Sequence, residues 1–318
     1  MLTTNQYKIG IILPVYNTAE FLPNCLDSIL SQTYRNFVIY AIDDASTDTS
    51  LSILGKYQSI DARLRIIKKQ KNEGVSAARN SGLSAIEREE AFDYITFCDS
   101  DDTLSPYFLE DLLDAIVKEE ADVSTCCYKR THCDFKSSDN HTNYCSYGSE
   151  SFIEQIFSLG RWRNVLGSGG YVWLRLFDAR KIKGIRFCTD KHLIEDELFC
   201  LAVATRISKI THIPKQLYLY SYRKNSLCQK EDFYAKLVLS RLKSLSFTKE
   251  ISHYAEILAA CAIVEYAQNL PRSLNPESIK IIKQLAKKGV SRKILSFKSY
   301  FFFYFHFYLP SKFKFKNN

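Results

Sequence analysis

Several patterns that would assign a protein to a familiar class are missing from this 318-residue sequence. Its ten cysteines include no Cys-x-x-Cys pair, two of them are adjacent (Cys126 and Cys127), and others lie in apolar runs. Such spacing is typical of reduced thiols that pack as small apolar residues in the cytosol. The N-terminus lacks the basic, apolar and small-residue order of a secretory signal. We therefore expect a cytoplasmic protein.

Glycine-rich nucleotide motifs are also missing. No GxGxxG segment follows an expected strand, which argues against a dinucleotide oxidoreductase. The segment PVYNTAE lacks the glycine-rich basic loop with which a nucleotidyltransferase holds a triphosphate. Hydrophobic residues make up 46% and charged residues 25%, which places the chain among folded proteins and excludes a disordered one.

Acidic residues are missing after Glu277, where ten basic residues remain. The formal net charge of +8 therefore comes from the residues after Glu277, and residues 1–277 carry about −2. Because that larger part is slightly acidic and has no recognisable nucleic-acid motif, we expect no nucleic-acid partner.

The last segment combines aromatic residues with lysines. Residues 300–309 are all aromatic, aliphatic or His306, and lysines flank them on both sides. A membrane span needs about 20 such residues, so this run is too short to cross. We expect it to associate peripherally with the anionic inner surface of the cytoplasmic membrane. The alternative is an element that covers the core with its aromatic face.

The first 130 residues alternate short β-branched runs with segments of helical periodicity. Strands are expected at 8–14, 37–43, 64–68, 94–98 and 122–128, and helices at 19–32, 47–57, 74–86 and 106–119. This alternation predicts an α/β fold with a mostly parallel, Rossmann-like sheet flanked by helices. Ligands of such sheets bind beyond the carboxyl ends of the strands.

The rest of the chain is expected to be more helical. Residues 131–148 are polar and aperiodic, which predicts a loop. Further helices are expected at 151–159, 195–205, 232–249, 252–269 and 276–287, and short strands at 209–213 and 217–223. We therefore predict a C-terminal helical region followed by the basic aromatic tail.

Two groups of acids follow expected strands. Asp43, Asp44 and Asp48 lie in IDDASTD, and Asp99, Asp101 and Asp102 lie in FCDSDDTLSP. Clustered carboxylates repel one another unless a cation or hydrogen-bond donors lie among them. Alternate acids on a tight turn suit Mn²⁺ or Mg²⁺ and leave positions for diphosphate oxygens and water. Alternatively, Asp99 to Asp102 only form a turn and a helix cap ahead of Pro106.

Two further segments have both a functional and a structural interpretation. In NEGVSAARNSG, Gly74 permits a sharp loop and Arg79 could bind a phosphate or a base, or it could be an exposed arginine in a helix. In IEDELF, Glu195, Asp196 and Glu197 open a helix, where acids favour the macrodipole. One of these carboxylates could instead be a general base, which transfer to an alcohol requires.

Taken in order, ILPVYN, DDASTD, NEGVSAARNSG, DSDD and IEDELF resemble the family 2 inverting glycosyltransferases, which have the GT-A fold. The later stretches GYVWLRLFDARKI and QLYLYSYRKNSLCQ look like the acceptor half of bacterial capsule, lipopolysaccharide and exopolysaccharide enzymes. The resemblance covers about residues 8–228. It implies a GT-A domain at 1–228, with a nucleotide-sugar half (1–130) and an acceptor half (131–228), before a C-terminal region at 229–318.

The resemblance also implies roles for individual residues. Pro14 and Tyr16 would lie under the base of the donor, and Asp44 would hydrogen-bond it. Arg79 and Arg223, with Ser226, would help to hold the nucleotide. Asp99 would contact the donor ribose or a metal-bound water, Asp101 would bind Mn²⁺ or Mg²⁺, and Asp196 would be the catalytic base. The implied donor is a UDP-sugar, and the implied acceptor is a surface glycan or a lipid-linked oligosaccharide. A catalytically inactive glycan-binding or scaffold protein of the same fold is the alternative.

The sequence departs from the family pattern at two places. Ala45 replaces a glycine after the acid pair, which is tolerable where that residue is not left-handed. Leu174 and Arg175 follow the tryptophan where many relatives have Asn-Lys. Because Arg and Lys are not interchangeable at a shaped site, the acceptor contacts are expected to differ.

Overall fold

The computed structural model describes residues 6–130, 144–158, 169–190 and 193–221. The chain divides into two compact units. The first comprises Met1–Ser149, Tyr171–Thr189 and Arg206–Arg223, and the second comprises Glu150–Gly170, Asp190–Thr205 and Lys224–Asn318. The predicted boundary at residue 228 stays a prediction, as do Arg223, Ser226, the helices after residue 232 and the aromatic tail, which lie outside the described residues.

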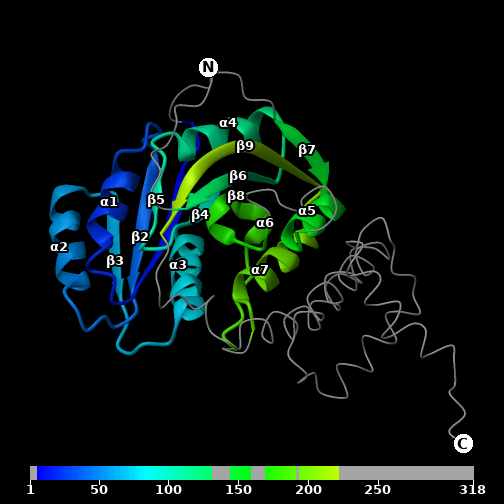
Figure 1. Cartoon of the computed structure of the whole chain (residues 1–318). Coiled ribbons are helices and arrows are strands. Elements are labelled where there is room, and N and C mark those ends of the chain that lie inside the picture. The colour runs from blue at the N-terminus through cyan, green and yellow to red at the C-terminus, as the bar shows by residue number, and fades with distance from the viewer. Residues whose placement is uncertain (1–5, 131–143, 159–168, 191–192, 222–318) are drawn as a thin grey trace, which may run out of the picture. The chain divides into compact units, whose positions relative to one another are not determined.

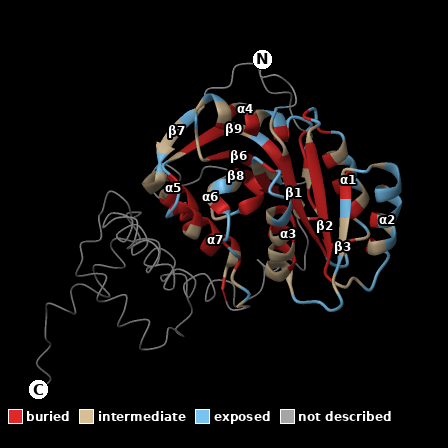
Figure 2. Cartoon of the chain, turned by 180° about the vertical axis from the view of Figure 1, so that it is seen from behind, coloured by how far each residue is buried: buried red, intermediate tan, exposed pale blue. Residues whose placement is uncertain are grey.

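Four parallel strands form one half of the sheet in the first unit (Figure 1). They are β1 (Ile9–Val15), β2 (Phe37–Asp43), β3 (Leu64–Lys68) and β4 (Tyr94–Phe97), in the order β3-β2-β1-β4. Every residue of β1 and β2 is buried, as expected for parallel strands that are covered on both faces (Figure 2). The predicted strands and the α/β fold class are confirmed.

The helices that follow these strands along the chain cover the two faces of the sheet. They are α1 (Leu22–Leu30), α2 (Ser50–Ile60), α3 (Val75–Glu89) and α4 (Phe108–Lys118). Ile9, Ile11 and Leu13 of β1 pack into one apolar cluster with buried residues of α1 and α4. The opposite face of β1 contacts α3 closely, because a Cβ at Gly82 would lie only 2.8 Å from Cγ2 of Ile12. Gly82 therefore allows the middle of α3 to pack directly on side chains of β1 and β2.

The second half of the sheet is mixed. It contains β5 (Thr103–Leu104), β6 (Val123–Arg130), β7 (Cys145–Gly148), β8 (Arg175–Asp178) and β9 (Lys209–Tyr220), with the 3-10 helix η2 (Val172–Leu174) before β8 and α6 (Ala179–Ile182) after it. β8 is antiparallel to both β4 and β6, whereas β6 and β9 are parallel. β5 and β7 pair antiparallel with β9.

Two predictions for this half were wrong in detail, and one strand was not predicted. The expected loop at 131–148 ends in β7, because pairing with β9 outweighs the polar character of Cys145–Gly148. The two short strands expected at 209–213 and 217–223 are one strand as far as Tyr220, because the pairing with β6 shifts register between Ile213 and Gln216 and accommodates Pro214. β8 was not predicted, since four buried residues are too few to show a period.

The described part of the second unit is helical. It contains α7 (Glu195–Ala204) and all but the first residue of α5 (Ser149–Ile156), and both helices were predicted. A Cβ at Gly170 would lie 2.6 Å from Cα of Glu197, so the backbone at Gly170 packs directly on the first turn of α7. Within the described residues, no helix is long and apolar enough to cross a membrane.

Candidate functional site

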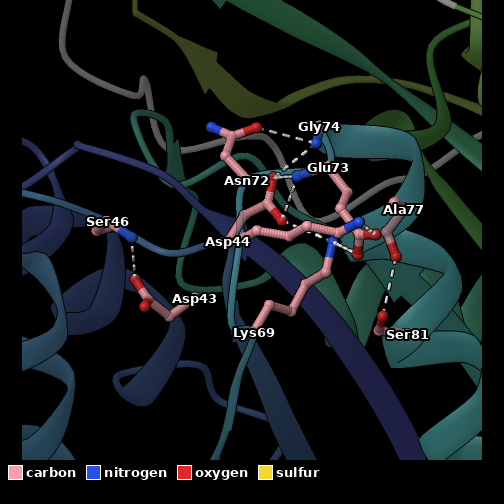
Figure 3. A network of polar contacts seen from close by, with 10 residues as sticks. Asp43, Asp44, Ser46, Lys69, Asn72, Glu73, Gly74, Ala77 and Ser81 are labelled. Atoms are coloured by element: carbon pink, nitrogen blue, oxygen red, sulfur yellow. Dashed lines mark hydrogen bonds and ion pairs between the residues drawn. The ribbon is translucent and has the colours of Figure 1, made fainter.

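The Asp44 carboxylate joins three elements where β2 ends (Figure 3). Its oxygens accept hydrogen bonds from Nζ of Lys69 at 2.6 Å and from the backbone N–H groups of Gly74 at 2.7 Å and Glu73 at 3.1 Å. Lys69 directly follows β3, and Gly74 precedes α3. Gly74 has φ of 91°, a conformation that glycine adopts without strain. Asp44 therefore fixes the loop that begins α3.

Lys69 forms a buried ion pair that the sequence analysis did not find. Its side chain is 9% exposed and its ammonium also contacts Oε2 of Glu73 at 3.0 Å. Burial acts to lower the pKa of Lys69, but the hydrogen bonds to Asp44 and Glu73 outweigh it and raise that pKa above its ordinary value. Lys69 therefore stays charged at neutral pH.

The loop after β1 lies against the end of β2. The backbone N–H of Asp44 donates to the carbonyl of Val15 at 2.9 Å, which places Tyr16 beside the Asp44 strand end. Pro14 is buried within β1 opposite Ile42, and Tyr16 is 44% exposed. Of the two residues expected under the base, Tyr16 therefore offers the accessible ring.

Backbone strain marks the loop that follows the acid pair. Ala45 has φ of 60°, in the left-handed region, so the condition under which alanine was expected to be tolerated is not met. A left-handed conformation costs an L-residue roughly 1–2 kcal/mol.

We predict that Ala45→Gly raises the free energy of unfolding by up to about 1 kcal/mol. Glycine removes this strain, but it also loses more backbone entropy on folding than alanine does, which offsets part of the stabilisation. Thermal unfolding of the full chain measures it. The matched control Ala77→Gly, inside α3, should destabilise by about 1 kcal/mol. A lower melting temperature for Ala45→Gly would contradict the strain.

The acidic turn after β4 contains two partly exposed carboxylates and one buried one. Asp99 and Asp101 are partly exposed, whereas Asp102 is 1% exposed. Asp102 accepts hydrogen bonds from the Tyr218 hydroxyl and from the Ser221 backbone, both at 2.7 Å. Burial, with the charges of Asp101 and Asp99, raises the pKa of Asp102 well above its ordinary value. Asp102 therefore holds the turn onto the end of β9.

Of the alternative in which these acids form a turn and a helix cap, the structure contains the turn, since the backbone N–H of Asp102 donates to the Asp99 carbonyl at 3.1 Å, but not the cap. Helix α4 begins at Phe108, and its N-cap residue Tyr107 forms no side-chain cap. Tyr218 instead stabilises the turn from the other side, since its hydroxyl also accepts a hydrogen bond from the backbone N–H of Asp99 at 3.2 Å. Asp102 and Tyr218 were missed as supports of the site because their pairing depends on a contact across 116 residues.

Arg79 is buried and contacts the acidic turn. It is 3% exposed, its Nη2 donates to Oδ1 of Asp99 at 2.9 Å, and its guanidinium lies 5.3 Å from the centre of the Phe187 ring. The interpretation as an exposed helix arginine was therefore wrong. The structure brings Arg79 together with Asp99, and a direct contact of Arg79 with a nucleotide stays a prediction.

Thr18 links the three loops at the carboxyl ends of β1, β2 and β4. Its backbone N–H donates to the Ser50 hydroxyl at 3.0 Å, and its own hydroxyl donates to that of Ser100 at 3.0 Å. Asn17, in the same loop, accepts hydrogen bonds from the backbone N–H groups of Thr47 and Asp48. The segments that carry Tyr16, Asp44 and Asp99 are thus part of one hydrogen-bonded edge.

Asp196 belongs to the second unit. It lies in the first turn of α7 between Glu195 and Glu197 and is 9% exposed. A negative charge in the first turn interacts favourably with the helix macrodipole, which agrees with the interpretation of these acids as residues that stabilise the helix end. Its role as a catalytic base stays a prediction.

The acidic turn has a donor set that suits a hard divalent cation. Among the described residues, no group of three or more His, Cys, Asp or Glu side chains could hold a metal by itself. Mg²⁺ is commonly bound by one or two carboxylates, with substrate phosphates and water completing its shell. Asp99 and Asp101 fit that arrangement, in which the diphosphate of a substrate supplies the missing oxygens.

Comparison with known protein families identifies the family of this chain. The profile described as glycosyl transferase family 2 matches residues 10–182, and the chain belongs to this family. Glycosyltransferase GlyA of Streptococcus pneumoniae serotype 4 is 34% identical over 228 residues, which are 69% of this chain and 31% of GlyA. The chain thus spans about a third of the length of that relative.

Solved structures share the fold at low sequence identity. Residues 1–349 of TarS from S. aureus, in complex with UDP-GlcNAc, align with a TM-score of 0.63 and 18% identity over 88% of this chain and 81% of that one. The mannosyltransferase PcManGT from Pyrobaculum calidifontis, in complex with GDP-Man and Mn²⁺, aligns with a TM-score of 0.56 and 15% identity over 91% and 82%. The predicted GT-A-type fold is confirmed.

Proposed function

We propose that this chain is a metal-dependent inverting glycosyltransferase. It transfers a sugar from a nucleoside diphosphate donor, a UDP-sugar, to a hydroxyl group of a cell-surface glycan or of a lipid-linked oligosaccharide. The observation that carries the proposal is the acidic turn at the carboxyl end of β4. There, two partly exposed carboxylates lie beside the loops that follow β1 and β2, where open α/β sheets bind their ligands.

Asp101 would bind Mn²⁺ or Mg²⁺, with Asp99 contacting the donor ribose or a metal-bound water. Once bound, the ion would supply positive charge that stabilises the departing diphosphate. Arg79 holds Asp99 in place through its hydrogen bond. The Mn²⁺ in the PcManGT complex supports the choice of metal.

The donor nucleotide would extend from the metal toward the end of β2. The exposed ring of Tyr16 would lie against the base, and Asp44 would accept a hydrogen bond from it. UDP-GlcNAc in TarS and GDP-Man in PcManGT support a donor of this chemical class.

Transfer would be a single displacement. Asp196 takes the proton of the acceptor hydroxyl while that oxygen forms a bond to the anomeric carbon. The bond from this carbon to the diphosphate oxygen breaks on the opposite face, the nucleoside diphosphate leaves, and the anomeric configuration inverts. Arg223 would help to hold the diphosphate.

The C-terminal tail would bring the enzyme to lipid-linked acceptors at the cytoplasmic membrane. Its lysines and aromatic rings suit the interface with anionic lipid. Salt-sensitive sedimentation with anionic vesicles, lost in a chain that ends at Pro276, tests this; equal sedimentation of both chains would reject it.

A screen of nucleotide sugars with Mn²⁺ tests the catalytic proposal and separates it from an inactive scaffold of the same fold. We expect the full chain to hydrolyse or transfer one donor, most readily a UDP-sugar. Turnover of none of them, with an acceptor mixture present, would favour the scaffold.

A further inference from the structure

Lys69 is a buried cation directly beside the carboxylate that the proposed function assigns to the donor base. Its Nζ lies 2.6 Å from Oδ1 of Asp44, and the two side chains are 9% and 3% exposed. The fold fixes the position of this pair, because Lys69 directly follows β3 and its backbone N–H donates to the Asp43 carbonyl at 2.9 Å.

The hydrogen-bonding capacity of this pair is not exhausted. An ammonium has three N–H donors, and within the described residues that of Lys69 contacts two carboxylates, those of Asp44 and Glu73. A carboxylate has about four acceptor sites, and Asp44 receives three donors, from Lys69, from Gly74 and from Glu73, whose N–H is shared between the two carboxylate oxygens at 3.1 and 3.2 Å. One N–H of Lys69 therefore remains beside the Asp44 carboxylate, which the proposed function assigns as the acceptor for a donor group of the base.

Only some bases match this arrangement. Uracil and guanine carry a carbonyl oxygen next to a ring N–H, so they present an acceptor and a donor on adjacent atoms. Cytosine and adenine carry an amino group next to an unprotonated ring nitrogen, which is the reverse. A ring nitrogen lone pair facing the Asp44 carboxylate would be repelled.

We propose that Lys69 is a specificity-determining residue that, together with Asp44, selects donors whose base has a carbonyl next to a ring N–H. Asp44 accepts the ring N–H, and the third N–H of Lys69 donates to the carbonyl. This inference rests on the proposed function, and it adds to it a residue and a rule: uracil and guanine nucleotides are accepted, and cytosine and adenine nucleotides are rejected.

The neighbouring aromatic ring fits the same base. The hydrogen bond from the Asp44 backbone to the Val15 carbonyl places Tyr16 next to the pair, and Tyr16 is 44% exposed. A stacked ring contributes affinity for any base, because every base has a π-face. Selectivity between bases is therefore left to groups that read the base edge, such as Asp44 and Lys69.

The first test measures binding of UDP, GDP, CDP and ADP to the full wild-type chain with Mn²⁺ by calorimetry. We expect UDP and GDP to bind at least about tenfold more tightly than CDP and ADP, the effect of one hydrogen bond to a charged group. Equal affinity for UDP and CDP would overturn the inference and leave the proposed function intact. Absence of binding by all four would overturn the proposed function itself.

The second test replaces the cation. Lys69→Met should weaken UDP binding about ten- to a hundredfold. CDP should weaken less than UDP, because cytosine presents an amino group rather than a carbonyl to the third N–H of Lys69. Lys71→Met is the matched control, since Lys71 also contacts Glu73 but its side chain is 78% exposed.

The control variant should keep the wild-type ratio of UDP to CDP affinity, and Lys69→Arg, which retains the cation, should restore part of it. An unchanged ratio in a folded Lys69→Met chain would overturn the role of Lys69. Thermal unfolding reports whether each variant is folded, and the comparison of bases in the wild type stands without any variant.

Discussion

Replacement of Asp101 by alanine is expected to lower kcat/KM for sugar transfer by about 10³ or more. Two acidic side chains of the turn after β4 are partly exposed, and Asp101 is the one assigned to the metal. Loss of the ion removes several kcal/mol of stabilisation from the leaving diphosphate, and each 1.36 kcal/mol corresponds to a factor of ten in rate. Initial rates with the donor found in the screen, at saturating Mn²⁺, measure it.

A matched control separates this effect from a general loss of negative charge. Asp27 lies on the exposed face of α1, and Asp27→Ala should leave the rate close to that of the wild type. Asp101→Ala should remain folded, because the buried support of the turn comes from Asp102 and Tyr218. A variant that kept more than a tenth of the wild-type turnover would remove Asp101 from the metal site.

Asp196→Asn is expected to lower kcat by about 10² to 10⁴ while the dissociation constant of UDP stays nearly unchanged. An amide has almost the shape of the carboxylate but cannot take the proton of the acceptor hydroxyl, and general base catalysis is worth roughly this factor. The split between kcat and UDP affinity is diagnostic, because a merely structural residue at the start of α7 would affect both.

The neighbouring acid provides the control for this substitution. Glu195→Gln changes the charge of the same helical turn and therefore tests the macrodipole interpretation. It should cost little stability, roughly 0.3–1 kcal/mol, and little activity. Equal losses of activity in Glu195→Gln and Asp196→Asn would reject Asp196 as the base.

Apolar runs and acid positions predicted the parallel half of the sheet well. Strands such as Phe37–Asp43 are continuous apolar segments bounded by polar residues, so their type and limits depend on local sequence. The acids after β2 and β4 could be placed at one edge for the same reason, because parallel strands that are connected by helices end on the same side.

The support of the site could not be predicted, because it depends on long-range pairing. Lys69 is one of three lysines at the end of β3 and in the loop that follows, and only the folded chain shows that it is the one that reaches Asp44. Likewise, DSDD does not reveal that Asp102 turns inward toward Tyr218, or that Arg79 is buried against Asp99. The strain at Ala45 also arises only in the folded loop. The sequence shows that an alanine is present there, but not that its backbone is left-handed.

The measurement that tests the central claim most directly is calorimetric binding of UDP to the full chain in the presence of Mn²⁺ and in the presence of a chelator. If Asp99 and Asp101 share a cation with the diphosphate, UDP should bind at least about tenfold more tightly with Mn²⁺, and this gain should vanish in Asp101→Ala. The same affinity with and without Mn²⁺ would contradict a metal-dependent donor site at the end of β4.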